Sequence, residues 1–190
     1  MSTLVTGGAR SGKSTFAEKL CMSRSTEAIY VATAQAFDEE MKGRIALHQL
    51  QRSQAGYAWR NVEEPLKLVE LLSNWGEQSR GEGEAAPAVL VDCLTLWLSN
   101  ILLSLEGEQD AETKVKSEIA RLADQAEQYP GQLILVTNEV GSGIVPEYPL
   151  GRLYRDLAGY MNQAIARRSS EVFLVTAGIP VELKSREYQL

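Results

Sequence analysis

A glycine-rich segment near the start of the chain has the residue types and spacing that bind phosphate groups. Residues 3–16 read TLVTGGARSGKSTF, and this string fulfils the phosphate-loop pattern. Glycines let successive backbone N–H groups point inward at an anion, and a helix that begins near Lys13 adds its positive end. We expect Lys13 to reach the β- and γ-phosphates of a nucleotide and the Ser14 hydroxyl to ligate Mg²⁺. The expected nucleotide-binding residues of this loop are Gly7, Gly8, Ala9, Arg10, Ser11, Gly12, Lys13, Ser14 and Thr15. The alternative is an ordinary glycine-rich turn.

A second chemical candidate is the acidic residue that ends the apolar run 89–92. In a parallel sheet, Asp92 would stand at the carboxyl edge beside the phosphate loop. There it could hold Mg²⁺ directly or through water. The alternative is that Asp92 caps the helical stretch that follows it, and both roles are compatible.

A third candidate is the polar end of the apolar run in residues 135–146, LVTNEVGSGIVP. Asn138 and Glu139 could orient a water molecule, a metal ion or a substrate hydroxyl. Gly141 and Gly143 would permit close approach of the backbone. Without the phosphate loop, this segment would be interpreted as an ordinary turn.

The only histidine of the chain, His48, lies between two arginines at helical spacing. Arg44, His48 and Arg52 would project from one face of a helix predicted over 38–52. Two flanking guanidinium groups disfavour protonation of the imidazole, and the neutral form is the nucleophilic one. The same arginines would attract a polyphosphate. The alternative is a surface or partly buried histidine without function.

The elements that would position these residues alternate between strand and helix. Strand-type runs occur at 3–6, 28–33, 88–92, 132–137 and 171–176, with a weaker candidate at 57–62. Helical patterns occur at 13–24, 38–52, 65–75, 94–105, 112–128 and 150–168. Such alternation, with strands that are apolar on both faces, predicts an α/β fold whose parallel sheet is covered on both sides.

The connecting segments are polar. Residues 79–87 are rich in Gly and Glu and predict a solvated loop, and residues 106–110 predict an acidic one. The helix at 111–128 is amphipathic, with a buried stripe made of Val115, Ile119, Leu122 and Ala126 and a solvated charged face. Residues 179–190 begin with a strand-like pattern and then become polar, so the end of the chain is expected to be loose.

Composition limits the class of protein. A chain of 190 residues with 44% hydrophobic residues predicts one globular domain over 1–190. A net charge of −6 argues against a nucleic-acid surface. No apolar run is long enough to span a membrane, and we expect no signal peptide before the first strand. Cys21 and Cys93 lack ligand-spaced partners, so we expect two buried free thiols and a cytoplasmic location.

Several motifs together resemble one family, the bifunctional adenosylcobinamide kinase / adenosylcobinamide-phosphate guanylyltransferase of cobalamin synthesis, of the CobU/CobP type. The resemblance extends from residue 3 to about residue 184. The matching motifs are GGARSGKS at 7–14, VATAQ at 31–35, Asp38 to Met41, Arg44-Ile45 with His48, VTNEVGSGIVP at 136–146, and Arg155-Asp156 with Gly159 and Asn162-Gln163. The block at 136–146 is far more specific than the phosphate loop, which many families share.

The resemblance implies a RecA-like fold of P-loop NTPases, two reactions and a homotrimer with sites near subunit contacts. ATP or GTP phosphorylates the corrinoid substrate adenosylcobinamide, and GTP then gives its GMP to that phosphate. A histidine on the second helix accepts the GMP in the family, and His48 occupies the matching place. This chain has Leu47-His48 where some relatives have His-His, and Asp92 where some have Glu.

Other functions fit parts of the pattern. A monofunctional P-loop kinase for another small molecule would use the phosphate loop and Asp92 but form no covalent adduct. A nucleotide-dependent switch is a different class, although the chain lacks the Asn-Lys-x-Asp element with which GTPases recognise guanine. A relative that binds nucleotide and has lost transfer is the third possibility.

Overall fold

The protein is built around one seven-stranded sheet with the strand order β3-β2-β4-β5-β1-β6-β7. The computed structural model describes residues 1–35, 52, 56–83 and 85–188. The strands are β1 (Ser2–Thr6), β2 (Glu27–Ala32), β3 (Ala58–Glu63), β4 (Val89–Asp92), β5 (Leu133–Val136), β6 (Glu171–Thr176) and β7 (Ile179–Glu182). All neighbouring pairs are parallel except β6 and β7. The predicted α/β class with a mainly parallel sheet is confirmed.

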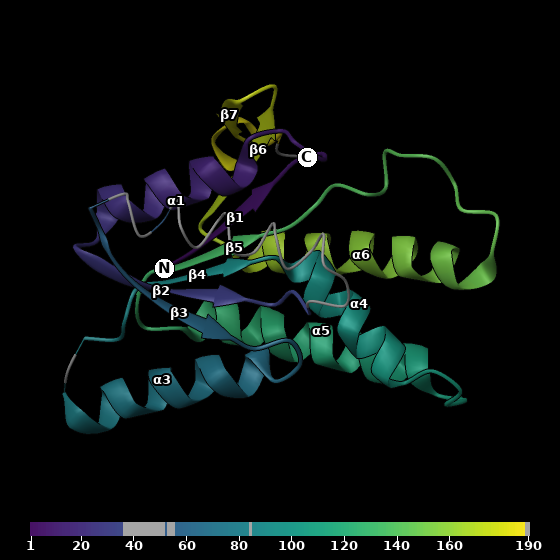
Figure 1. Ribbon diagram of the computed structural model, residues 1–190, viewed down its shortest axis with the longest axis horizontal. Coiled ribbons are helices and arrows are strands. Elements are labelled where there is room, and N and C mark those ends of the chain that lie inside the picture. Colours follow the sequence, from purple (N-terminus) through teal and green to yellow (C-terminus); the bar gives the residue numbers. More distant parts are fainter. Residues whose placement is uncertain (36–51, 53–55, 84, 189–190) are drawn as a thin grey trace.

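Helices cover both faces of this sheet, as the strand composition predicts (Figure 1). The helices of the described part are α1 (Lys13–Arg24), α3 (Leu68–Glu82), α4 (Leu94–Ser104), α5 (Ala111–Gln128) and α6 (Pro149–Arg168), with a 3-10 turn, η1, at Lys184–Arg186. Helix α1 lies on one face, and its residues Ala17 and Cys21 enter one apolar cluster. The other four helices pack on the opposite face and share a larger cluster.

The strands are apolar throughout because alternate residues point to opposite faces and both faces are buried. In β1, Leu4 belongs to the cluster under α3–α6, whereas Val5 belongs to the cluster under α1. In β2, Ile29 and Tyr30 divide in the same way. The sheet therefore fixes which strand residues meet α1 and thus which ones lie near the phosphate loop.

The prediction of a solvated loop at 79–87 is partly wrong. Helix α3 begins at Leu68 rather than near residue 65 and continues to Glu82, and the chain then turns at Gly83 with φ of +69°. The buried side chains of Leu68 and Leu72 dock this helix on the core. Arg80 anchors its last turn by donating a hydrogen bond to the Gln128 carbonyl at 3.0 Å. Packing and this anchor outweigh the glycine content, since a helical Gly costs only about 1 kcal/mol.

The other predicted strands and helices are confirmed within the described residues. The stripe of α5 is fully buried, both cysteines are buried and free, and no described helix has the length and apolar content of a membrane span. The weak strand candidate forms β3, and the strand-like start of the tail forms β7. The predicted helix at 38–52 lies outside the described residues apart from Arg52.

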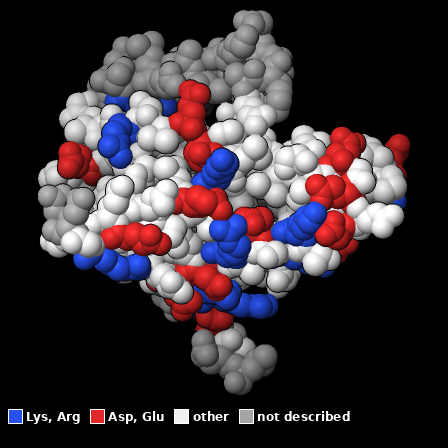
Figure 2. Space-filling model, turned by 90° about the horizontal axis from the view of Figure 1, so that it is seen from below, with Lys and Arg blue, Asp and Glu red and all other residues white. Residues whose placement is uncertain are grey.

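The outer face of α3 and α5 carries basic and acidic side chains in close alternation (Figure 2). Arg121 of α5 pairs with Glu70 of α3 and with Glu118, both at 2.7 Å. Lys116 pairs with Glu112 at 2.7 Å, one helical turn away. These pairs are solvated, as predicted for the polar face of this helix, and each contributes little to stability.

Candidate active site

The phosphate-loop residues lie at the carboxyl edge of the sheet, between the end of β1 at Thr6 and the start of α1 at Lys13. The loop is tied to both neighbours of β1: the Glu139 N–H donates to the Gly7 carbonyl at 3.0 Å, and the Gly178 N–H donates to the Ser11 carbonyl at 2.8 Å. These two bonds hold the loop against the segments that follow β5 and β6.

Two glycines of the loop are required by space and by backbone geometry. A Cβ atom at Gly7 would lie 2.4 Å from the Val175 carbonyl oxygen and 2.6 Å from the Ser11 Oγ. Gly12 has φ of +92°, and a Cβ atom there would lie 3.2 Å from the Gly178 Cα. Arg10 also has a positive φ, of 56°. The loop therefore curls tightly, which is the geometry that turns backbone N–H groups toward an anion.

Lys13 is buried at the start of α1 and has no carboxylate partner within the described part of the chain. It is 9% exposed, and its Nζ donates to the Gly8 carbonyl at 3.1 Å. Helix α1 has no acidic residue in its first turn, and no side chain caps it. A cation and uncapped N–H groups thus share one helix end, where a phosphate group would satisfy both.

The other residues of the loop differ in how far they are exposed to solvent. Ser14 is partly buried, Thr15 is exposed, and Gly8, Ala9 and Arg10 are exposed. The Ser11 Oγ is buried and accepts or donates no hydrogen bond among the described residues. The loop thus presents hydroxyl groups and backbone amides at one place.

Asp92 ends β4 at the same edge as the loop, but one strand separates it from β1. Asp92 is in register with Val136 of β5, and Val136 is in register with Val5 of β1. Two strand spacings amount to about 10 Å. The alternative role as a helix cap is not what the structure shows, because the N-cap of α4 is Cys93 and no side chain caps that helix.

The Asp92 carboxylate has a partner that the sequence analysis missed. The Tyr30 hydroxyl of β2 donates a hydrogen bond to Asp92 Oδ2 at 3.1 Å. Burial raises the pKa of Tyr30 well above its usual value, and the nearby Asp92 charge raises it further. A tyrosine inside an apolar strand was the available signal, since a buried hydroxyl must find a partner.

Asn138 is fixed between α4 and α6 directly after β5. Its Nδ2 donates to Thr95 Oγ1 at 2.7 Å, and its carbonyl accepts a bond from Asn162 Nδ2 at 3.2 Å. The Thr137 hydroxyl completes the set by donating to Asn162 Oδ1 at 2.8 Å. Asn138 therefore has a defined orientation at the carboxyl edge.

Glu139, the residue after Asn138, is exposed. Its backbone contacts Gly7, and its carboxylate accepts a hydrogen bond from the Gly141 N–H at 3.1 Å. Arg155 of α6, another residue absent from the predicted site, donates to the Gly141 carbonyl at 2.6 Å. The structure thus brings the Glu139 backbone next to the first glycine of the phosphate loop, and Arg155 holds the Gly141 turn that follows Glu139.

Arg52 does not point into open solvent toward a ligand. It is 4% exposed, and its guanidinium carbon lies 3.5 Å from the centroid of the Tyr30 ring. It also donates to Asn61 Oδ1 at 3.3 Å and pairs with Glu18 at 3.4 Å. Its companions in the predicted triplet, Arg44 and His48, lie outside the described residues.

The described residues contain no cluster of three or more histidine, cysteine or acidic side chains that would cage a metal ion. Mg²⁺ seldom needs such a cage, because it is usually bound through one or two carboxylates together with substrate phosphates. Asp92 offers a carboxylate of that kind, and Ser14 offers a hydroxyl oxygen. The thiol of Cys93, the residue after Asp92, is in its unreactive protonated form because burial raises its pKa.

Comparison with known proteins gives one consistent result. Residues 3–183 match the family described as cobinamide kinase / cobinamide phosphate guanyltransferase. The chain is 44% identical over 189 residues to the bifunctional adenosylcobalamin biosynthesis protein CobP of Pseudomonas aeruginosa, covering 97% of this chain and 98% of that protein. It is 40% identical over 192 residues to the CobU protein of Escherichia coli and over 194 residues to that of Salmonella typhimurium, covering 97% of this chain and all of each relative.

Proposed function

The chain belongs to the cobinamide kinase / cobinamide phosphate guanyltransferase family, and we propose how its residues divide that family's two activities. The enzyme phosphorylates adenosylcobinamide and then transfers GMP from GTP to the phosphate, giving adenosylcobinamide-GDP. The family match and the three bifunctional relatives favour this function over that of a monofunctional P-loop kinase. The observation that carries the proposal is that the phosphate loop, Asp92 and Asn138-Glu139 all lie at the carboxyl edge of the sheet.

In the kinase step, the phosphate loop holds the triphosphate of ATP or GTP. Lys13 neutralises charge on the β- and γ-phosphates, and the amides of residues 7–15 surround them. Ser14 and Asp92 would hold Mg²⁺, which supplies further charge neutralisation when bound. The substrate hydroxyl attacks the γ-phosphorus in line, and the nucleoside diphosphate leaves.

The substrate hydroxyl needs an orienting group beside the γ-phosphate. Glu139 suits this role because its carboxylate is exposed and its backbone is bonded to Gly7. Asn138 is held by Thr95 and Asn162 and keeps the segment in place. We assign Glu139 the contact with the substrate hydroxyl and Asn138 the positioning of that contact.

In the guanylyl transfer, the neutral imidazole of His48 attacks the α-phosphorus of GTP and pyrophosphate leaves. The product is a phosphoramidate, in which protonation of the ring makes imidazole a good leaving group. An oxygen of adenosylcobinamide phosphate then attacks the same phosphorus, takes GMP and releases the histidine. Arg44 would assist by attracting the triphosphate. The support for this assignment is that His48 is the only histidine of the chain.

The test is to incubate the enzyme with α-labelled GTP and Mg²⁺, using wild type and His48→Ala. We expect an acid-labile, alkali-stable label on the wild type and none on the variant, which should keep kinase activity within about threefold. Full labelling of His48→Ala would overturn the assignment to this residue. An active wild type that never carries label would overturn the covalent route, and loss of both activities in the variant would indicate a shared binding role.

We also propose that the enzyme is a cytoplasmic homotrimer. The trimer follows from the family resemblance and is supported by an exposed apolar segment between β5 and α6. Ile144 is 95% exposed and Tyr148 is 65% exposed, with Val145 between them also exposed. Exposed apolar patches of this kind often mark subunit contacts. The cytoplasmic location is supported by two free, buried cysteines.

A further inference from the structure

One side of helix α6 holds the segment that carries Glu139, which leads from β5 to the start of α6 (Figure 1). Asn162 donates a hydrogen bond to the Asn138 carbonyl at 3.2 Å, and Arg155 donates one to the Gly141 carbonyl at 2.6 Å. Arg155 and Asn162 are about two helical turns apart, so their side chains leave the same side of the helix. Helix α6 therefore holds this segment both before and after Glu139.

Gly141 connects Arg155 to the Glu139 carboxylate. Its carbonyl accepts the bond from Arg155 Nη2, while its N–H donates to Glu139 Oε1 at 3.1 Å. A Cβ atom at Gly141 would also lie 3.1 Å from that carboxylate oxygen, which is tighter than an ordinary van der Waals contact. The carboxylate thus rests against the backbone of a glycine that Arg155 holds from the other side.

The charge of Arg155 has no acidic partner among the described residues. Its hydrogen bond in that part of the chain is the one to Gly141, and its buried Nε has no partner there. A partly buried guanidinium group that serves only the fold is normally matched by a carboxylate, as Arg24 is matched by Glu171. Arg155 also belongs to a motif to which the two proposed reaction steps give no role.

We propose that Arg155 is a positioning residue for the kinase step, which fixes Gly141 so that the Glu139 carboxylate faces the substrate hydroxyl. This inference rests on the contact proposed between Glu139 and that hydroxyl. Arg155 itself does not touch the reacting atoms. Its loss should spare the phosphate loop, because the bond from the Glu139 N–H to Gly7 follows a residue that Asn162 holds separately.

Arg155→Met tests this role, because methionine keeps much of the side-chain volume and cannot donate to Gly141. The kcat for phosphorylation should fall about tenfold, since misplacing an orienting group is costly in the transition state. The KM for the nucleotide and the rate of guanylyl transfer to supplied adenosylcobinamide phosphate should stay within about twofold. Arg155→Lys can still donate to the carbonyl and should restore kcat to within about threefold of the wild-type value. Equal loss of both reactions would indicate a merely structural role and overturn the inference.

Arg152→Met is the matched control. Arg152 precedes Arg155 on α6 and donates to the Pro146 and Glu147 carbonyls at 3.3 and 2.6 Å, so it holds the other end of the same segment. Phosphorylation by this variant should stay within about twofold of the wild-type rate. A fall as large as that of Arg155→Met would mean that the segment needs support at any point, and it would overturn a specific role for Arg155.

Gly141→Ala reaches the carboxylate while Arg155 stays in place, and it keeps the inference testable if Arg155→Met folds poorly. The added Cβ would press on Glu139 Oε1. The kcat for phosphorylation should therefore fall about threefold or more, with guanylyl transfer unchanged. Normal phosphorylation by Gly141→Ala, or by a folded Arg155→Met, would overturn the inference.

A double-mutant cycle with Glu139→Ala separates this inference from the role proposed for Glu139. If Arg155 acts through Glu139, adding Arg155→Met to Glu139→Ala should lower kcat by less than about twofold more. Losses that multiply would overturn the inference and leave the role of Glu139 intact. Normal phosphorylation by Glu139→Ala would instead overturn the proposed contact with the substrate hydroxyl, and the inference with it.

Discussion

The two ends of helix α1 each carry a cation, but only the cation at the last residue has a carboxylate partner in the described part of the chain. At the first residue, Lys13 is buried, and its polar partner in the described part of the chain is a single carbonyl, that of Gly8. At the last residue, Arg24 forms two hydrogen bonds with the Glu171 carboxylate, at 2.5 and 3.0 Å. The helix dipole favours a cation at the last residue, Arg24, and disfavours a cation at the first residue, Lys13.

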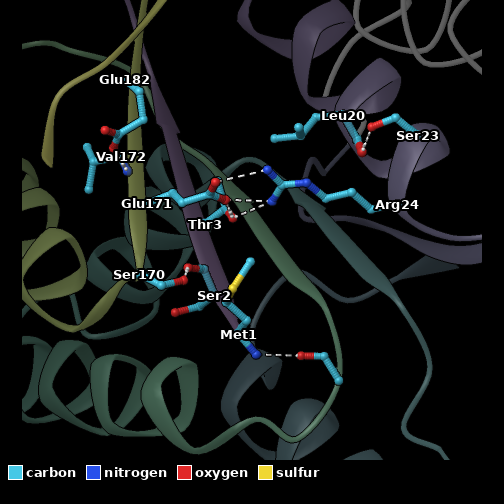
Figure 3. A network of polar contacts seen from close by, with 11 residues as sticks. Met1, Ser2, Thr3, Leu20, Ser23, Arg24, Ser170, Glu171, Val172 and Glu182 are labelled. Atoms are coloured by element: carbon cyan, nitrogen blue, oxygen red, sulfur yellow. Dashed lines mark hydrogen bonds and ion pairs between the residues drawn. The ribbon is translucent and has the colours of Figure 1, made fainter. Parts of the chain in front are cut away.

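The Arg24 end is a closed network at the amino edge of the sheet (Figure 3). Thr3 of β1 donates to the same Glu171 carboxylate at 2.9 Å. The Ser170 hydroxyl, from the turn before β6, donates to the Ser2 carbonyl at 2.7 Å. Each group there has a protein partner, and together they join α1, β1 and β6.

The contrast between Arg24 and Lys13 shows that the carboxyl edge of the sheet is less stable without a ligand than the amino edge. At the amino edge, charges are matched within the protein, which stabilises it. At the carboxyl edge, Lys13 lies in the positive field of its own helix, without a cap or an acidic neighbour in the first turn. That arrangement is unfavourable until an anion binds, and it is therefore suited to a phosphate group.

The largest expected effect comes from Lys13→Met, which removes the charge and keeps most of the aliphatic stem. Both phosphorylation and guanylylation should fall at least 100-fold, about 2.7 kcal/mol in transition-state stabilisation. The free energy of unfolding should stay within about 1 kcal/mol of the wild-type value, because an unfavourably placed cation is lost together with one hydrogen bond. Steady-state kinetics and urea unfolding measure the two quantities. A variant with normal kinetics, or one that is unfolded, would contradict the comparison.

A smaller effect is expected at the other end from Glu171→Gln. Loss of the ionised acceptor should lower the free energy of unfolding by about 1 kcal/mol, with both activities kept within about twofold. Hydrogen bonding to Arg24 lowers the pKa of Glu171 below its usual value. The stabilisation is therefore complete above the unfolded-state pKa and is lost as the pH falls through the lower folded-state pKa.

Urea unfolding of both proteins at several pH values checks this sign. The difference in stability between wild type and Glu171→Gln should be largest near neutral pH and should shrink as the solution becomes strongly acidic. A difference that grew on acidification would show that the Arg24–Glu171 pair is not its source.

The smallest effect is expected from Arg24→Lys, which keeps the charge but loses the paired N–H groups of the guanidinium. Stability should fall by about 0.5 kcal/mol, since an exposed lysine–glutamate pair retains part of the interaction. Thermal unfolding at low and high salt measures this change. A loss as large as that of Glu171→Gln would mean that the two-bond geometry, rather than the charge, supplies the stabilisation.

Much of the site was predictable because it is encoded locally. The phosphate loop is one contiguous stretch, and Asp92, Asn138 and Glu139 each follow an apolar run whose end in a parallel sheet lies at one edge. The same rule could not predict that β5 separates Asp92 from β1, because hydrophobic periodicity predicts where strands occur and not their order in the sheet. The helical continuation of α3 through 79–82 was missed for a related reason, since the packing of Leu68 and Leu72 and the Arg80 anchor come from distant residues.

The sequence by itself determined the alternation of strands and helices, the curled phosphate loop and the family, since these depend on neighbouring residues and on patterns of fixed period. Only the tertiary structure decided that Tyr30 bonds a carboxylate 62 positions away and that Arg24 meets a carboxylate 147 positions away. Such contacts depend on strand order and on the register of the sheet, which many sequences with the same periodicity could satisfy differently.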